Sequence, residues 1–342
     1  MTDDNEVLVT SLAWSPHRPD AHGTLQTPSK DNLSTLTDST SLQITSPGST
    51  CQEPSNELAI TLTSGEVGIL SIPDSLLAGG DATAAVSADD WHFESLTAHS
   101  LEAWTTIFWP RDWPLAGVLS GGDDAVLACS ALSQVADEFS RSTPTWSNRK
   151  IHGAGVTAIL PLRIDTDHFH EAGRTPPHVL LTGSYDDHLR VLSIPGIPGT
   201  STEYIRQPQI LHEINLEGGV WRLKLIDESH HTDEAAEKVR YSITVLVSCM
   251  YAGAKIVDLS LTKRQEGQMG DEGEWTSTVL ATFEEHESMC YACDVRAVPE
   301  HEVQNEDNAS SKPHTIISSS FYDKRLCLWK YAPEGQTLST EP

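Results

Sequence analysis

Residues 180–192 read Leu-Leu-Thr-Gly-Ser-Tyr-Asp-Asp-His-Leu-Arg-Val-Leu, and variants of this pattern recur along the chain. Each copy joins an apolar segment, a cluster of Ser, Thr or Gly, usually an Asp at a turn, and a second alternating segment, which is typical of two strands joined by a tight turn. The pattern returns at 119–127, 247–257 and 317–329. A hairpin that recurs at intervals of about 40 to 70 residues predicts stacked β-sheet blades.

A histidine stands before the strand upstream of several of these hairpins, at His99, His152 and His286. The order of His, strand, Ser/Thr-rich strand, Asp turn and a strand that can end in Trp is that of a WD repeat. It is clearest over 286–329, where Trp329 ends the last strand. We therefore expect an all-β WD-repeat β-propeller.

We expect one propeller domain over residues 1–342. Residues 7–14 predict an innermost strand and 58–72 a weaker hairpin; the other blades are predicted at 91–130, 146–194, 207–260 and 275–330. Five blades are recognisable in the sequence, whereas a closed propeller with this repeat commonly has about seven. We expect the N-terminal blades to be missing, the alternative being a smaller or open ring with exposed strand edges.

Several segments lack the strand pattern. The Ser/Thr-rich segment 15–57 is expected to be a disordered insertion, since it has no hydrophobic periodicity. Polar, acidic loops are predicted near 131–147, 227–240, 261–275 and 297–313, and 331–342 are predicted to form a short irregular tail.

The chain is strongly acidic, with 22 Lys and Arg against 49 Asp and Glu and a formal net charge of -27. A field of this sign repels phosphate backbones and attracts cations. We therefore expect no direct nucleic-acid binding, and a cationic substrate or a basic protein partner instead.

The cysteines and the apolar segments indicate a cytoplasmic protein. Six cysteines are dispersed along the chain, as suits a reducing compartment. Cys290 and Cys293 have a Cys-x-x-Cys spacing, yet no second pair accompanies them, so we expect strand packing and neither metal nor cofactor. No segment approaches the roughly 20 apolar residues of a membrane span, and the acidic start Met-Thr-Asp-Asp-Asn-Glu is unlike a signal peptide.

In a WD propeller the His-bearing loops and the Asp-bearing turns emerge on one face, around the mouth of the central channel. Such residues normally form a hydrogen-bond network with the Ser and Thr of the second strand. We expect this structural role for His152, Asp186, His286 and Asp323.

Aromatic residues that this network does not need are predicted to lie on the same rim. They are Trp104, Tyr185, Trp221, Tyr251 and Tyr322. Rings around an acidic opening can hold a quaternary ammonium group through cation–π attraction. The alternative is that they fill the contacts between blades.

Taken in order, the motifs resemble the WD-repeat diphthine methyltransferase family. The resemblance covers roughly residues 91–330 and is carried by His-Ser-Leu-Glu-Ala-Trp (99–104), Ser-Gly-Gly-Asp-Asp (120–124), Thr-Gly-Ser-Tyr-Asp-Asp-His (182–188), Gly-Gly-Val-Trp-Arg-Leu-Lys (218–224), Cys-Met-Tyr-Ala-Gly-Ala-Lys-Ile (249–256) and Ser-Ser-Phe-Tyr-Asp-Lys-Arg-Leu-Cys-Leu-Trp (319–329). It implies a methylesterase of diphthamide biosynthesis. The implied substrate is methylated diphthine, the modified histidine of translation elongation factor 2, and the products are diphthine and methanol. This substrate carries a trimethylammonium group, a cation that suits an acidic, aromatic rim.

The sequence contains no Gly-x-Ser-x-Gly elbow, His-Glu-x-x-His or phosphate-binding Gly-rich loop. Ester hydrolysis would then need an activated water, a base and donors for the oxyanion. We expect His99 to activate the water, Glu102 or Asp123 to orient its imidazole, and Arg222 or backbone N–H groups to face the oxyanion. Other candidates are Asp124, His152 and His188. The alternative function is a non-catalytic scaffold that presents a basic protein partner to another enzyme.

Overall fold

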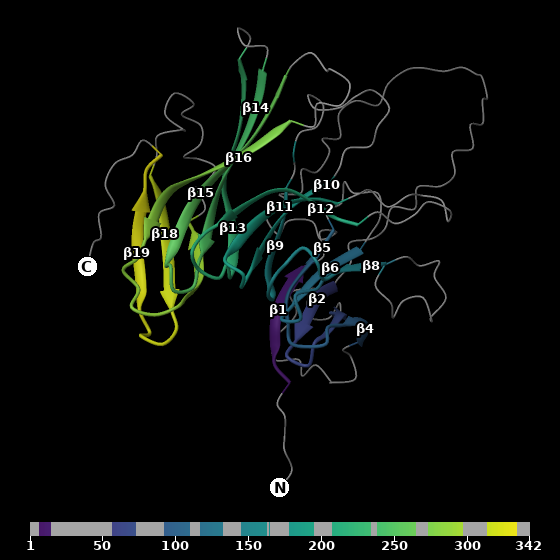
Figure 1. Cartoon of the computed structure of the whole chain (residues 1–342). Helices are drawn as coiled ribbons and strands as arrows, with labels where there is room; N and C mark the ends of the chain where they lie inside the picture. Colours follow the sequence, from purple (N-terminus) through teal and green to yellow (C-terminus); the bar gives the residue numbers. More distant parts are fainter. Residues whose placement is uncertain are drawn as a thin grey trace, which may run out of the picture.

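A computed structural model describes residues 7–14, 57–72, 92–109, 117–132, 145–162, 164, 178–194, 207–233, 238–264, 273–296 and 313–333. Nearly all of the predicted insertion at 15–57, and most of the predicted tail, lie outside these residues. The regular structure that is described is all β-strand, in five antiparallel sheets arranged as the blades of a β-propeller (Figure 1). The predicted fold class is confirmed.

The strands follow one another in space as they do in sequence. The first sheet contains β1 (Val9–Trp14), β2 (Glu57–Leu62), β3 (Glu66–Ser71) and β4 (His92–Ala98). The second contains β5 (Ala103–Phe108), β6 (Gly117–Gly122), β7 (Leu127–Ala131) and β8 (Trp146–Asn148). The third contains β9 (Val156–Leu162), β10 (His178–Ser184), β11 (His188–Ile194) and β12 (Gln209–Asn215).

The last two sheets differ in size. The fourth contains β13 (Arg222–Asp233), β14 (Lys238–Ser248), β15 (Ala254–Arg264) and β16 (Glu274–Phe283). The fifth has three described strands, β17 (Cys290–Val295), β18 (His314–Ser320) and β19 (Leu326–Tyr331). We number the blades 1 to 5 in this order.

The predicted blade boundaries are wrong by one strand. The segments expected to open the blades at 91–130, 146–194, 207–260 and 275–330 are β4, β8, β12 and β16, and each pairs with the strand before it. Strands that follow one another in sequence usually pair. Each of these four is therefore the outermost strand of the sheet that contains the strand before it. The loop that follows then carries the chain to the innermost strand of the next blade. The His-bearing segments therefore join two blades.

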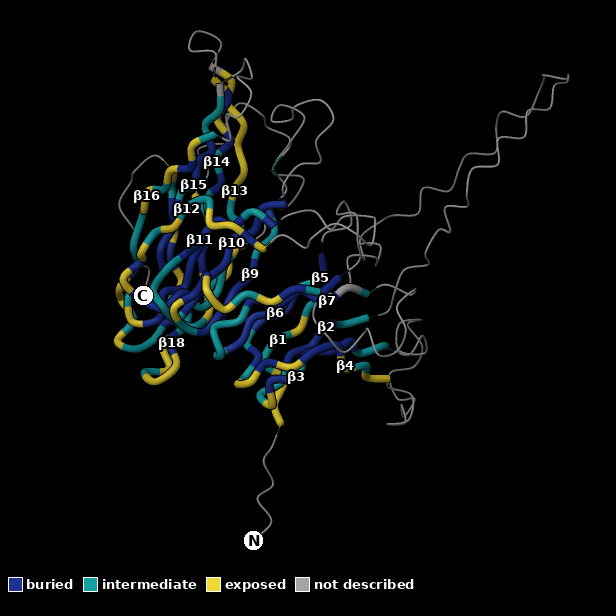
Figure 2. Tube along the Cα trace, turned by 45° about the vertical axis from the view of Figure 1, so that its right-hand side comes forward, coloured by how far each residue is buried: buried dark blue, intermediate teal, exposed yellow. Residues whose placement is uncertain are grey.

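Neighbouring blades pack through apolar faces. The innermost strands contact in succession, β1 with β5, β5 with β9, β9 with β13 and β13 with β17. Between blades 2 and 3, for example, Leu127 and Trp146 form one buried cluster with Leu180 and Leu192. Figure 2 shows the buried residues concentrated where the blades face one another. The hairpin strands supply these residues by their period-2 alternation.

Blade 4 extends beyond its neighbours, which corrects the prediction of a loop at 227–240. There β13 and β14 pair as far as Asp233 and Lys238. One face of this extension is apolar, because Val239 and Tyr241 are buried and Tyr241 belongs to a cluster that includes Trp275. Along β14 the exposed residues Lys238 and Arg240 alternate with these, while on β13 the exposed His230 contacts the Tyr241 ring at 5.2 Å between centroids.

Trp329 offers a test of blade packing. Its indole is 1% exposed, stacks on Phe283 at 4.8 Å between centroids, and donates from Nε1 to Ser318 Oγ at 3.1 Å. Trp329→Ala should lower the free energy of unfolding by about 3 to 5 kcal/mol, since it leaves a large cavity; urea denaturation measures this. Leu328→Ala is the control: Leu328 is 59% exposed, so the change should stay within about 0.5 kcal/mol. Equal losses in both variants would contradict the assignment.

Candidate functional site

Hydrogen bonds tie the loop that enters blade 2 to a turn of that blade. His99 contacts Asp124 Oδ1 through Nδ1 at 2.9 Å and Ser120 Oγ through Nε2 at 3.0 Å. Asp124 also accepts a hydrogen bond from the backbone N–H of Ser100 at 2.9 Å. Burial alone would raise the pKa of Asp124, but the hydrogen bonds from Ser100 and His99 lower it. The loop, the second strand and the turn are thereby joined.

Blade 5 has a related arrangement, in which a second serine takes the place of aspartate beside the histidine. His286 contacts Ser320 Oγ through Nδ1 and Ser318 Oγ through Nε2, both at 2.8 Å. Asp323 accepts from the backbone N–H of Glu287 at 3.0 Å. His286 and Asp323 thus lie in the kind of network expected for them.

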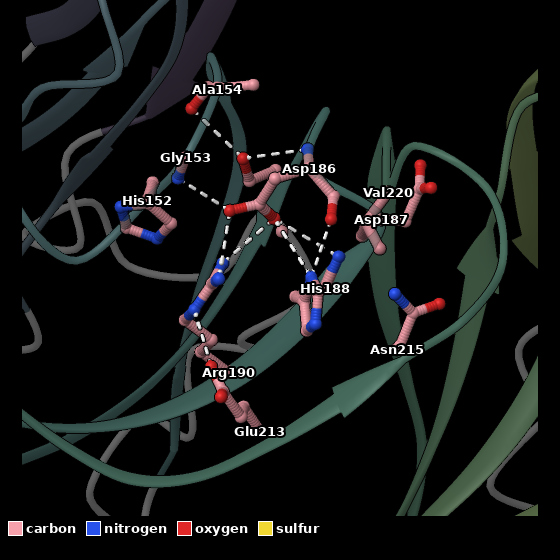
Figure 3. A network of polar contacts seen from close by, with 12 residues as sticks. His152, Gly153, Ala154, Asp186, Asp187, His188, Arg190, Glu213, Asn215 and Val220 are labelled. Carbon is pink, nitrogen blue, oxygen red and sulfur yellow. Dashed lines mark hydrogen bonds and ion pairs between the residues drawn. The ribbon is translucent and has the colours of Figure 1, made fainter.

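Blade 3 uses an arginine in place of the His–Asp contact, as Figure 3 shows. Asp186 accepts from the backbone N–H of Gly153 at 2.7 Å and pairs with Arg190 at 2.9 Å. His152 contacts Thr182 Oγ1 through Nε2 at 3.0 Å. Its Nδ1 is buried and has no hydrogen-bond partner among the described residues. Burial lowers the pKa of His152 to about 3, with the nearby Arg190 cation acting in the same direction.

Blade 4 has a leucine where the other loops have histidine. The backbone N–H of Leu216 donates to Asp187 O, as that of His99 donates to Gly65 O. The carbonyl of Leu216 accepts from the buried Nζ of Lys255 at 2.6 Å. A lysine from the third strand therefore holds this loop.

These contacts give the His99 ring other partners than those predicted from the sequence. Both of its ring nitrogens are engaged, and its carboxylate partner is Asp124 where Glu102 or Asp123 was expected. The alternative candidates Asp124 and His152 lie in the same kind of blade contact. His188 contacts the backbone oxygen of Asp186 through Nδ1.

Four aromatic rings from four blades meet around Trp221; we call them the central cluster. They are Trp104 on β5, Tyr185 in the β10–β11 turn, Trp221 just before β13, and Tyr291 on β17. The centroid of Trp221 lies 5.4 Å from that of Trp104, 5.2 Å from Tyr185 and 5.0 Å from Tyr291. Such separations are favourable for aromatic pairs. Three of the five predicted aromatic residues are thus brought together.

The other two predicted rings lie further out. Tyr322 is 67% exposed and contacts Phe321 at 5.1 Å, and Phe321 contacts Tyr291 at 6.2 Å. Tyr251 is 63% exposed, and its hydroxyl donates to Asp187 Oδ2 at 3.1 Å. In the described part of the chain, Tyr251 has no ring contact with the central cluster.

Charged groups of both signs border the central cluster. Trp104 donates from Nε1 to Asp123 Oδ1 at 3.3 Å, and the backbone N–H of Asp123 donates to the backbone oxygen of Glu102 at 2.8 Å. Arg222 lies over the Trp221 ring, with Cζ 5.1 Å from the centroid. Among the described residues no carboxylate pairs with Arg222, and burial lowers the pKa of its guanidinium. Of the four residues in the catalytic hypothesis, three therefore lie beside the cluster and His99 lies in the blade network.

Two glycines allow these groups to approach one another. A Cβ atom at Gly155 would lie 2.8 Å from Asp123 Oδ1 and 2.9 Å from Tyr185 Cδ2. A Cβ atom at Gly219 would lie 2.5 Å from Met250 Sδ. A side chain at Gly155 would force Asp123 and Tyr185 apart, whereas one at Gly219 would displace the end of the Met250 side chain.

Comparison with known proteins identifies the relatives of this chain. The diphthine methyltransferase of Schizosaccharomyces pombe is 29% identical over 279 residues, which cover 80% of this chain and 60% of that protein. The diphthine methyltransferase of Saccharomyces cerevisiae is 30% identical over 250 residues, 70% of this chain and 52% of that protein. The chain is similar to the diphthine methyltransferases of these two yeasts.

The resemblance read from the motifs is therefore confirmed. The mouse diphthine methyltransferase is also similar, at 30% identity over 200 residues, which cover 58% of this chain and 31% of that protein. The chain spans about half the length of the two fungal diphthine methyltransferases, and less of the mouse protein. No protein-family model matches it.

Two aromatic residues in or next to the central cluster, Tyr291 and Phe321, were not predicted from the sequence. Tyr291 stands five residues after His286, as Trp104 stands five residues after His99, so the spacing from the blade histidine could have identified it. The backbone N–H of Phe321 donates to Met289 O, as that of Tyr185 donates to Gly155 O. Phe321 therefore makes the backbone hydrogen bond that Tyr185 makes in blade 3, although Tyr322 is the residue that precedes the turn aspartate.

The cysteines show no sign of redox or metal chemistry in the described residues. Those described are all free, and no group of three or more His, Cys, Asp or Glu there could hold a metal ion. Burial raises the pKa of Cys129, Cys249 and Cys290 to about 12 and that of Cys293 further. In the same residues no helix is long and apolar enough to span a bilayer.

His152 predicts a loss of stability in acid. Its pKa is about 3 in the folded protein and about 6.5 in the unfolded chain. The unfolded chain therefore binds a proton first as the pH falls, so this contribution is fully present above pH of about 6.5 and is lost below it. The free energy of unfolding should fall by up to about 1.4 kcal/mol per pH unit between these values.

Chemical denaturation of His152→Gln across this pH range is the measurement. The variant should show a shallower slope, because Gln does not titrate. His92→Gln is the control, since His92 is exposed on β4, and it should keep the slope of the parent chain. An unchanged slope in His152→Gln would contradict the assignment.

Proposed function

We propose that this chain is a methylesterase of diphthamide biosynthesis that hydrolyses the methyl ester of methylated diphthine on translation elongation factor 2. The names of its relatives support an action on diphthine. The observation that carries the proposal is the central cluster, in which rings from four blades meet with the Asp123 carboxylate bonded to Trp104. Aromatic faces beside a carboxylate suit a quaternary ammonium group.

In this proposal the trimethylammonium group binds beside Trp104 and Tyr185. A quaternary ammonium has no N–H to donate, so it is recognised by ring faces and by charge, not by directed hydrogen bonds. Arg222 already lies over Trp221, which leaves the Trp104 side of the cluster, with the Asp123 and Glu102 carboxylates, for the ligand cation. The overall charge of -27 favours the approach of such a substrate.

The proposed chemistry is attack of a water molecule on the ester carbonyl. Asp123 accepts a proton from the water as its oxygen bonds to the carbonyl carbon. Arg222 stabilises the resulting oxyanion, because its Nε and Nη2 make no hydrogen bond to the described residues while Nη1 donates to Thr157 O and Trp221 O. The C–O bond to the methoxy group then breaks, and methoxide takes the proton and leaves as methanol. His99 has no free ring nitrogen for the role first assigned to it.

Mass spectrometry of elongation factor 2 carrying methylated diphthine tests the activity. Incubation with the chain should remove one methyl group, with release of methanol. Asp123→Asn should lower kcat about 100- to 10,000-fold, the usual contribution of general base catalysis. Glu102→Gln tests the other carboxylate, and Glu274→Gln is the control, because Glu274 is exposed on the outermost strand of blade 4.

The behaviour of the unmodified chain distinguishes the methylesterase from the non-catalytic scaffold. Binding of the elongation factor without loss of the methyl group would favour the scaffold. Loss of activity in Glu102→Gln alone would transfer the role of base to Glu102. Full activity in both variants would overturn the proposed mechanism.

The aromatic contribution can be measured separately. The ligand is the trimethylammonium derivative of α-aminobutyric acid, which has the same cation and carboxylate as the product, and calorimetry gives its affinity. Trp104→Leu should weaken binding about 2- to 30-fold, the range expected for one cation–π contact. Trp104→Phe keeps a ring but loses the N–H donated to Asp123, so it should bind more tightly than Trp104→Leu. Equal affinities in the two variants would contradict a role for the ring.

A further inference from the structure

We propose that Phe321 and Tyr322 form a docking platform for a basic segment of the protein substrate, beside the residue being modified. The inference rests on the proposed function and extends it from the modified side chain to the polypeptide that carries it. The two residues occupy the β18–β19 turn and are named here the aromatic platform.

The aromatic platform is exposed and yet held in place. Both side chains are 67% exposed, and their rings meet edge to face at 5.1 Å and 89°. The backbone N–H of Phe321 donates to Met289 O at 3.2 Å, and that of Tyr322 donates to Ser288 Oγ at 3.1 Å. Because the turn is fixed to the preceding loop, the rings are presented to solvent with little freedom to fold inward. Rigid exposed aromatic residues are frequent anchors of protein interfaces.

The platform continues directly from the proposed active site. Phe321 contacts Tyr291 at 6.2 Å, and Tyr291 contacts Trp221 at 5.0 Å. A path of rings therefore leads from the central cluster to the edge of blade 5. A side chain held at the central cluster would bring its own polypeptide towards this path.

The surrounding charge selects the kind of segment that fits. The loop before β17 carries three exposed acidic residues, Glu284, Glu285 and Glu287. Arg325 pairs with Glu287 at 3.5 Å. Glu284 and Glu285 have no ion pair in the described part of the chain, and they outnumber Lys324, the one exposed cation left in the turn. Flat rings accept the apolar stems of Lys and Arg, while neighbouring carboxylates attract the charged ends. The same carboxylates disfavour an anionic membrane surface.

Two substrates with the same ester separate docking from chemistry. One is elongation factor 2 carrying methylated diphthine, and the other is the methyl ester of the trimethylammonium derivative of α-aminobutyric acid. The double variant Phe321→Ala/Tyr322→Ala should raise KM for the protein about 5- to 30-fold, as loss of interface anchors does. Its kcat/KM for the small ester should stay within about twofold of the parent chain, since the small ester does not reach the platform.

The control variant is Leu328→Ala, because Leu328 is an exposed apolar residue of the same blade, 59% exposed, outside the path of rings. It should leave both substrates unaffected. Equal losses on the two substrates in the double variant would overturn docking and indicate damage to the central cluster. No loss on either would overturn it as well.

A failure of the proposed function would be recognised by a parent chain that hydrolyses neither substrate. The platform is then tested by binding alone, with immobilised elongation factor 2, where the double variant should bind about 5- to 30-fold more weakly. Unchanged binding would overturn the platform whatever the activity. If the double variant lost binding to phosphatidylserine vesicles but bound the elongation factor as the parent chain does, the two rings would instead be assigned to membrane binding.

Discussion

The loop that enters each blade is hydrogen-bonded to a turn of that same blade. These hydrogen bonds determine where the innermost strand of the blade begins. His99 and Asp124 make the contact in blade 2, and the ladder of β5 follows within a few residues. Because the start of the strand is fixed, the residue two places into β5, Trp104, comes to the centre of the face. The central cluster depends on this register as much as on the rings themselves.

Different chemistry serves the same purpose along the chain. Blade 5 has histidine with two serines, blade 3 an arginine on the aspartate, and blade 4 a lysine on the carbonyl of Leu216. These contacts satisfy most of the buried polar atoms that would otherwise be costly, although Nδ1 of His152 in blade 3 has no partner among the described residues. The variation shows that the position of the loop matters more than the side chains that hold it. It also explains why blade 4, without a histidine, still delivers Trp221 to the cluster.

The strand pattern predicted the fold because alternation and Asp turns report directly on buried faces, as in 180–192. It could not set the blade boundaries, because an outer strand such as β12 has the same alternation whichever sheet it joins. The long strands of blade 4 were hidden by polar residues, since only their inner face, with Tyr241, is apolar.

The candidate site could be predicted only in part from the sequence. Trp104, Tyr185 and Trp221 could be placed from the order of strands and turns. His99 was misplaced because adjacent aspartates, Asp123 and Asp124, cannot be told apart in sequence, although one enters the blade network and the other contacts Trp104.

The buried thiols give this molecule a set of internal reporters. Cys129, Cys249 and Cys290 lie in blade 2, just after β14 of blade 4, and in blade 5, and each has a pKa of about 12. Such a thiol is almost entirely protonated at neutral pH, and the thiolate is the form that alkylating reagents attack. Alkylation of these cysteines therefore follows the opening of the blade that holds them, so the rates at the three positions would rank the local stabilities of the three blades.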